Sequence, residues 1–175
     1  KLGRKPRRMR LIKVGTGKNI PNRVDIDLRD KLANLRIERG HFECDSVESC
    51  KAKGKSNSCL TVLVDRASRK TIIKKTASKT SVETMKSILE AMKPYKNTIK
   101  SITYDNGSEF AKHEKINEEL NIKSYFCKPY HSWEKGTVEN INGLIRRFFP
   151  KGTNFDTISE EAISYVEDWI NNRPM

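Results

Sequence analysis

The chain has 175 residues, of which 35% are hydrophobic and 33% are charged, and its formal net charge at pH 7 is +13. This length accommodates one domain with a substantial core and is too short for two large domains. No stretch approaches the roughly 18 to 20 apolar residues of a membrane span, and no apolar run follows the basic N-terminus, so the sequence predicts neither a membrane segment nor a signal peptide.

Residues 1–24 differ in charge from the rest of the chain. They hold nine Lys or Arg and no acid, whereas the remainder carries 26 basic and 22 acidic side chains. Glycines and prolines without periodicity predict an extended segment here, followed by a short helix from Asp27 to Leu35. We therefore divide the chain into a basic N-terminal arm or linker, residues 1–36, and a core domain, residues 37–175. Such an arm indicates a polyanionic partner, most simply nucleic acid, although a solvated tail with no specific partner would have the same composition.

Three strands are predicted at the start of the core. His41 to Ser49 alternates in character, which places Glu43, Asp45 and Val47 on one face of a strand. Two further strands follow, from Cys59 to Val64 and from Lys70 to Thr76. The sequence Asp65-Arg-Ala-Ser68 between them predicts a hairpin turn.

Helices then alternate with strands. A capping box, Thr80-Ser-Val-Glu83, begins a helix whose apolar residues are Val82, Met85, Leu89 and Met92, and Pro94 ends it. A strand from Ile99 to Tyr104, a helix from Glu109 to Leu120, a strand from Lys123 to Cys127 and a helix from Glu134 to Phe149 follow. A second capping box, Thr157-Ile-Ser-Glu160, begins the last helix. This order predicts an α/β fold: a mixed five-stranded sheet, with a three-strand antiparallel meander, flanked by helices.

Three acids occupy positions suited to a metal site. Asp45 lies in the first strand, which is expected near the centre of the sheet, and Asp105 follows the fourth strand, where α/β folds expose functional groups. Glu139 lies on the helix after the fifth strand, on a different face from the apolar stripe of that helix. Carboxylates are the ligands that Mg²⁺ prefers, and two such ions stabilise the attacking and leaving oxygens of a phosphoryl displacement. For any one of these acids taken alone, a simpler role is to cap a helix, to form part of a turn or to contact solvent.

Three segments carry a family resemblance. They are Gly40-His-Phe-Glu-Cys-Asp45, Tyr104-Asp-Asn-Gly-Ser-Glu-Phe110 and Ser132-Trp-Glu-Lys-Gly-Thr-Val-Glu-Asn-Ile-Asn-Gly-Leu-Ile-Arg-Arg-Phe-Phe-Pro-Lys-Gly-Thr153. They resemble the three signature blocks of bacterial insertion-sequence transposases, most closely the insertion-sequence-thirty family, and Asn171-Asn-Arg-Pro174 resembles that family's next segment. Phe42 stands where tryptophan is common in the family and Cys44 where glycine is common, differences that packing could absorb.

The resemblance implies a ribonuclease-H-like catalytic core of the DDE type over residues 37–175. Asp45, Asp105 and Glu139 would be its catalytic and metal-binding residues, holding two Mg²⁺ or Mn²⁺ ions. The implied activity is DNA transposition, in which phosphodiesters at transposon ends are cut and the freed 3′-hydroxyl attacks target DNA. A non-catalytic DNA-binding regulatory relic and an RNA–DNA hybrid nuclease on the same fold remain alternatives.

The implied partners are double-stranded DNA, as terminal inverted repeats and as target, and other copies of the protein in a homodimer or higher oligomer. The implied location is the bacterial cytoplasm, in association with the nucleoid. The family also has a helix-turn-helix region upstream, to which the basic arm would be the linker.

The candidate DNA contacts fall into an arm group and a core group. The arm group is Arg4, Lys5, Arg7, Arg8 and Arg10, and the core group is His131, Asn142, Arg146, Arg147 and Lys151. A solvated helix face would give the same pattern for the basic residues of the core group. Ordinary hydrogen bonding is an equal alternative for His131, and also for His41.

Other residues have weaker assignments. Trp133 is expected to anchor the core at a helix entry, with stacking on a base as the alternative. Glu43 would either support the metal site from beside Asp45 or pair with a lysine. Glu109 is assigned to the positive N-terminal end of its helix, and His113 is expected on the surface of that helix.

The four cysteines, Cys44, Cys50, Cys59 and Cys127, form no C-x-x-C pair and no zinc-binding spacing with the histidines. Cys44 and Cys59 lie in apolar segments and are predicted to be reduced core thiols. This pattern favours a reducing, intracellular compartment.

Overall fold

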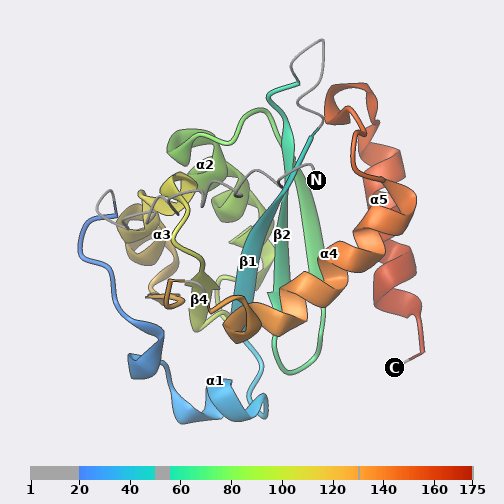
Figure 1. Ribbon diagram of the computed structural model, residues 1–175. Coiled ribbons are helices and arrows are strands. Elements are labelled where there is room, and N and C mark those ends of the chain that lie inside the picture. The colour runs from blue at the N-terminus through green and yellow to red at the C-terminus, as the bar shows by residue number, and fades with distance from the viewer. Residues whose placement is uncertain (1–19, 50–55, 130, 175) are drawn as a thin grey trace, which may run out of the picture.

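The computed structural model describes residues 20–49, 56–129 and 131–174, without the side chains of residues 132 and 133. Five strands form one sheet, and helices cover both of its faces (Figure 1). This confirms the predicted α/β architecture. The elements in chain order are η1 (Ile26–Leu28), α1 (Lys31–Leu35), β1 (His41–Glu48), β2 (Cys59–Asp65), β3 (Thr71–Thr76), α2 (Ser81–Met92), η2 (Lys93–Tyr95), β4 (Ser101–Tyr104), η3 (Ser108–Phe110), α3 (His113–Leu120), β5 (Lys123–Phe126), η4 (Ser132–Lys135), α4 (Gly136–Phe148), η5 (Phe155–Thr157) and α5 (Glu160–Asn172).

The strand order is β3-β2-β1-β4-β5, so β1 is central, as predicted. β1 and β3 both pair antiparallel with β2, and β4 pairs parallel with β1 and β5. The β2–β3 connection is the predicted hairpin turn, in which Asp65 Oδ1 accepts hydrogen bonds from the backbone N–H groups of Ala67 and Ser68 at 3.1 and 2.7 Å. The later strands are parallel because each follows a helix that returns the chain to the same end of the sheet.

Two apolar clusters lie on opposite faces of the sheet. Phe42, Cys44 and Leu63 belong to the cluster that contains residues of α2 and α3. Val47 and Val62 belong to the cluster that contains residues of α4 and α5. Since side chains alternate along a strand, Glu43 and Asp45 point toward the α4 side with Val47, as the periodicity predicts. Phe42 and Cys44, the two departures from the family pattern, are buried in the core.

Three helix starts differ from the sequence-based expectation, one of them being the helix predicted from Glu109, which is η3 followed by α3 from His113. The predicted helix at 27–35 is two short pieces, because Asp30 interrupts it and caps α1, its side chain accepting from the N–H of Leu32 at 2.7 Å. The capping box expected at Thr157 is also misplaced. Ser159 caps α5, and its hydroxyl accepts from the N–H of Ala162 at 3.2 Å.

The buried face of α2 is rotated from the predicted apolar stripe. Val82 is 41% exposed, whereas Ser87 and Ile88 are buried. The reason is a polar contact with the sheet: Thr76 Oγ1 donates to Ser87 Oγ at 2.9 Å, which turns this polar position inward. The predicted cap is present, with the Thr80 side chain accepting from the N–H of Glu83.

The chain from residue 20 packs against the core. The N–H of Phe126 donates to the carbonyl of Val24 at 2.9 Å, and Arg29 donates to Thr103 Oγ1 at 3.2 Å. Arg66 Nε donates to the carbonyl of Ala33 at 2.9 Å. The second half of the predicted arm is therefore tied to β4, β5 and the hairpin, while residues 1–19 lie outside the described residues. Within the described ranges, no helix has the length and apolar character needed to cross a membrane.

Candidate active site

Asp45 and Asp105 lie on adjacent parallel strands. The register pairs Phe42 with Ile102 and Glu43 with Thr103. Asp45 and Asp105 follow this last pair by the same number of residues, so they lie at the same level of the two strands. Their side chains are 23% and 43% exposed, respectively. The parallel pairing therefore brings together two carboxylates that are 60 residues apart in sequence, within reach of solvent.

Lys135 links these two carboxylates. Its Nζ lies 3.3 Å from Asp45 Oδ1 and 3.3 Å from Asp105 Oδ2, and it donates to the carbonyl of Cys44 at 3.3 Å. The lysine side chain is only 5% exposed. Burial by itself would lower the pKa of Lys135, but the negative charges of Asp105 and Asp45 outweigh this and raise the pKa. A buried ammonium group therefore neutralises part of the charge of the acid pair.

The loop after β4 fixes Asp105. The N–H of Gly107 donates to Asp105 Oδ1 at 2.8 Å, and Asn106 Nδ2 donates to the carbonyl of Cys127 at 2.8 Å. A Cβ at position 107 would overlap the carboxylate of Glu109, so a side chain there would require the end of the Glu109 side chain to move. The Asp-Asn-Gly sequence of the second block therefore makes a compact loop that holds Asp105 beside Asp45.

A buried ion pair fixes the start of α4. Glu43, which is fully buried, forms an ion pair with Arg66, whose side chain is 5% exposed. The other oxygen of Glu43 accepts a hydrogen bond from the backbone N–H of Val138 at 2.9 Å. Glu43 thus occupies the positive end of the α4 dipole and fixes the helical turn that carries Glu139. The prediction that Glu43 pairs with a lysine is wrong, because its partner is Arg66.

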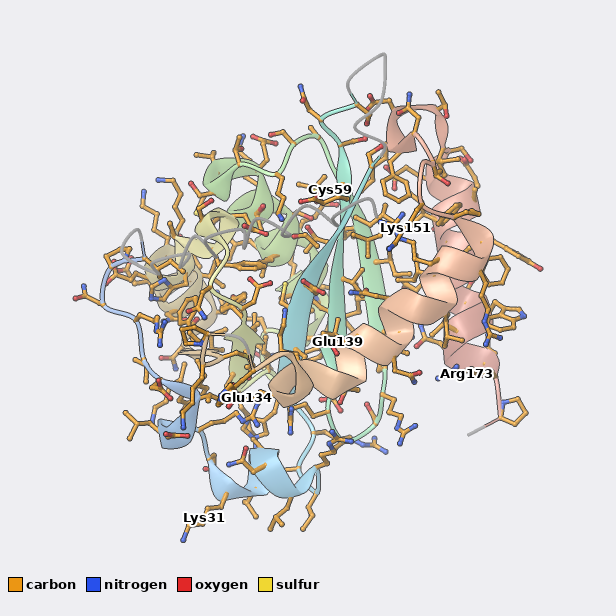
Figure 2. The ribbon with its side chains drawn as sticks, in the orientation of Figure 1. Lys31, Cys59, Glu134, Glu139, Lys151 and Arg173 are labelled. Atoms are coloured by element: carbon orange, nitrogen blue, oxygen red, sulfur yellow. The ribbon has the colours of Figure 1, made fainter. Side chains whose placement is uncertain are left out.

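Glu139 lies in the first turn of α4 and is exposed. Figure 2 shows its side chain near the start of this helix, on the part of α4 that lies beside β1. One turn further along, Asn142 Nδ2 donates to Asp45 Oδ2 at 2.8 Å. The predicted apolar stripe of α4 is buried at Val138, Ile141, Leu144 and Ile145. This packing leaves Asn142 on the side of the helix that faces Asp45, with the exposed Glu139 one turn before it.

The loop before α4 is held by Glu134. Its carboxylate accepts from the backbone N–H of Lys128 at 2.8 Å and lies 3.4 Å from His131 Nδ1. Two residues of the Trp-Glu-Lys-Gly sequence in the third block therefore have structural roles. Glu134 stabilises the loop, and Lys135 contacts Asp45 and Asp105. The sequence analysis gave Lys135 no role, although the residue lies in the third block that carries the family resemblance.

The predicted DNA contacts of the core have different environments. Arg147 and Lys151 are exposed. Arg146 donates hydrogen bonds to three backbone carbonyls, that of Glu48 at 2.7 Å and those of Phe149 and Pro150 at 3.4 Å. Asn142 contacts Asp45, as described above. Arg4, Lys5, Arg7, Arg8 and Arg10 lie outside the described residues, as does the Trp133 side chain.

The assignment of His113 to the helix surface is wrong. His113 is 2% exposed rather than on the surface, and its ring packs edge-on against Phe126 with centroids 4.9 Å apart. Glu109 lies in the first turn of η3, as its assignment to a helix N-terminus predicts, and it also forms an ion pair with Lys79 at 2.9 Å. His41 has an ordinary hydrogen-bonding role, with Ser101 Oγ at 2.7 Å and Glu38 at 2.8 Å.

The cysteines within the described residues are buried free thiols: Cys44, Cys59 and Cys127. Burial raises the pKa of Cys59 to about 11 and that of Cys127 to about 12. The thiols therefore stay protonated at neutral pH and are poor metal ligands.

The acid pair fits a divalent cation. Asp45 and Asp105 offer hard oxygen atoms, and both already share one cationic partner, Lys135. The carboxamide oxygen of Asn142, whose amide nitrogen donates to Asp45, is buried without a hydrogen-bond partner among the described groups. In this conformation, the described residues contain no cluster of three His, Cys, Asp or Glu side chains that could hold a metal ion alone.

Comparison with known proteins gives the family context. A model of the integrase core domain family matches residues 36–132, more than half of the chain. The chain is 44% identical over 155 residues to the transposase for insertion sequence element IS4351 of Bacteroides fragilis, covering 89% of this chain and 46% of that protein. It is 37% identical over 157 residues to transposase InsI for insertion sequence element IS30A of Escherichia coli, strain K12, covering 89% and 40%. The chain thus spans less than half the length of these relatives, and the resemblance to the insertion-sequence-thirty family is confirmed.

Solved structures share the fold. The catalytic core domain of HTLV-2 integrase in complex with magnesium, in its dimeric form, has a TM-score of 0.59 at 22% identity, covering 79% of this chain and 90% of that chain. A chain of the simian T-cell lymphotropic virus intasome in complex with PP2A regulatory subunit B56 gamma has a TM-score of 0.64 at 22% identity, covering 79% and 50%. These similarities confirm the ribonuclease-H-like fold.

Proposed function

The chain belongs to the integrase core domain family, and from that premise we propose that it is the catalytic domain of a DNA transposase. The observation that carries the proposal is the acid pair. Asp45 and Asp105 extend from adjacent parallel strands, share one cationic partner, and lie beside the helix that bears Glu139. The names of the transposase relatives support the same activity.

We assign the metal site to Asp45 and Asp105, with Glu139 as the third carboxylate. Two Mg²⁺ or Mn²⁺ ions, when bound there, supply charge stabilisation for the attacking and leaving oxygens of an in-line phosphoryl displacement. The magnesium named with the HTLV-2 integrase core supports this choice of ion.

The chain's own residues hold this site in position. Asn142 orients Asp45, the N–H of Gly107 orients Asp105, and Glu43 fixes the first turn of α4. Such preorganisation matters because catalysis depends on groups that are already in place for the transition state. None of the three acids acts as a covalent nucleophile. The 3′-hydroxyl freed by the first cut would attack target DNA at the same site.

The proposed substrates are double-stranded DNA at transposon ends and in the target, acted on in the bacterial cytoplasm by a homodimer or higher oligomer. A net charge of +13 supports a polyanionic partner. Arg147 and Lys151, both exposed, are the proposed core contacts that the structure leaves most accessible, and the proposed arm contacts precede residue 20.

The test is a cleavage and joining assay. The chain is incubated with labelled duplex DNA carrying a transposon end, with Mg²⁺ or Mn²⁺, and with a labelled RNA–DNA hybrid in parallel. We expect cleavage and strand transfer of the duplex, lost in Asp45→Asn, Asp105→Asn and Glu139→Gln while DNA binding is retained. Glu160→Gln, on the exposed start of α5, is the matched control. Selective cutting of the hybrid, or unimpaired cutting by the three variants, would overturn the proposal.

A further inference from the structure

Lys135 is the most deeply buried ammonium group in contact with the proposed site. Its side chain is 5% exposed, against 38% for Lys79, which also bridges two acids, Glu48 and Glu109. Desolvating a charged amine is unfavourable unless opposite charges compensate. The position of Lys135 is therefore one that the acid pair itself stabilises.

The surroundings of the Lys135 ammonium group are those of a small cation site. Three oxygen atoms lie 3.3 Å from Nζ: one from Asp45, one from Asp105 and the backbone carbonyl of Cys44. All three belong to β1 or to the residue that follows β4, so rigid strands hold them. Hard oxygen atoms of this kind also suit Mg²⁺ and Mn²⁺.

We propose that Lys135 is a built-in counter-cation that stabilises the metal-free acid pair and must withdraw from it when divalent metal binds. This inference rests on the proposed function, because it assigns metal to Asp45 and Asp105. A divalent ion between these carboxylates would lie beside the ammonium group, and two positive charges this close in a partly desolvated site repel strongly. Lys135 is thus a positioning residue that determines the affinity of the site for divalent metal.

The location of Lys135 makes such withdrawal feasible. It is the residue immediately before α4, where η4 gives way to the helix, so its side chain can swing without unwinding α4. Gly136 follows it, and apart from its chain neighbours and the backbone of its own helix no heavy atom lies within 4 Å of the position a Cβ would occupy there.

The first test measures Mn²⁺ affinity, by electron paramagnetic resonance of free Mn²⁺, for the wild type, Lys135→Met and Lys135→Gln. Removal of the competing charge should tighten binding about tenfold, the change that about 1.4 kcal/mol of relieved repulsion produces. The control is Lys74→Met. Lys74 lies on the edge strand β3 and forms an exposed ion pair with Glu90, so its removal should leave the Mn²⁺ affinity unchanged. Equal or weaker binding by both Lys135 variants would overturn the inference.

The second test uses the unaltered chain, so it does not depend on the folding of any variant. Acetylation of lysines by an amine-reactive ester is followed by peptide mass spectrometry with and without Mn²⁺. Lys135 should be protected without metal and acetylated several times faster with it, whereas Lys74 should react at one rate. An unchanged Lys135 rate at saturating Mn²⁺ would contradict displacement.

Asp105→Asn separates this inference from the proposed function. If the wild type binds Mn²⁺ and Asp105→Asn does not, the metal site stands, and the Lys135 results alone decide the inference. If the wild type and Asp105→Asn bind Mn²⁺ equally, or neither binds it, the metal site itself is wrong and both proposals fall.

Discussion

Glu43→Gln should destabilise the fold far more than so small a change in shape implies. The substitution leaves Arg66 buried without its counter-charge, and Arg29, which is also buried, adds a like charge nearby. Breaking a buried ion pair by removing one partner typically costs about 3 to 5 kcal/mol. Glutamine retains an oxygen that can accept from the N–H of Val138, so we expect the lower end, about 3 kcal/mol, because that hydrogen bond survives.

For a domain of this size, a loss of about 3 kcal/mol corresponds to a fall in melting temperature of about 6 to 12 °C. Urea and thermal unfolding followed by circular dichroism measure both quantities. The matched control is Glu90→Gln, which breaks an exposed pair with Lys74 and should cost less than about 1 kcal/mol. Adding Arg66→Met to Glu43→Gln should recover part of the loss, since no buried charge is then unpaired. A Glu43→Gln protein as stable as the control would refute the reasoning.

Three further perturbations probe the arm, the buried histidine and the site. Deletion of residues 1–19 leaves the packed segment from Ile20 intact and should weaken DNA binding. The slope of log K against log salt should become shallower by roughly 0.9 for each phosphate that the arm neutralises. Equal slopes for both proteins in a filter-binding titration would show that the arm does not contact DNA. Burial lowers the pKa of His113 below its ordinary value of 6.5, so the unfolded chain takes up the proton first and stability should fall as pH drops below 6.5. His113→Gln should flatten that loss between pH 7 and 5 in urea titrations, and parallel curves would contradict it. Asn142→Ala removes a donor to Asp45 and should slow single-turnover cleavage about tenfold, the effect of about 1.4 kcal/mol; an unchanged rate would make this hydrogen bond dispensable.

The sequence was sufficient to predict the strands and the helix that carry the site residues. Alternation along His41 to Ser49 placed Glu43 and Asp45 on one face, and the structure places both toward α4. The stripe of α4 was predictable because its apolar residues are numerous and regularly spaced. The order of strands and helices predicted a mixed sheet that begins with an antiparallel meander, which the structure has.

Contacts between distant residues could not be predicted in the same way. The interaction of Lys135 with Asp45 spans 90 residues, and that of Arg66 with Glu43 joins a turn to a strand. Local patterns carry no information about such pairings, which tertiary packing decides. The burial of His113 was not predicted for a related reason: α3 has eight residues, too few for its periodicity to show that an imidazole ring packs on Phe126.

The exchange of one metal ligand tests the central claim most directly. Cleavage of a labelled transposon end is measured for the wild type, Asp105→Cys and Asp105→Asn, each in Mg²⁺ and in Mn²⁺. A thiolate is a poor ligand for hard Mg²⁺ and a better one for Mn²⁺. If Asp105 holds the metal, the wild type should cut with both ions, Asp105→Cys with Mn²⁺ only, and Asp105→Asn with neither. Cutting by Asp105→Asn at the wild-type rate in Mg²⁺ would contradict the account, since the acid pair would then hold no catalytic ion.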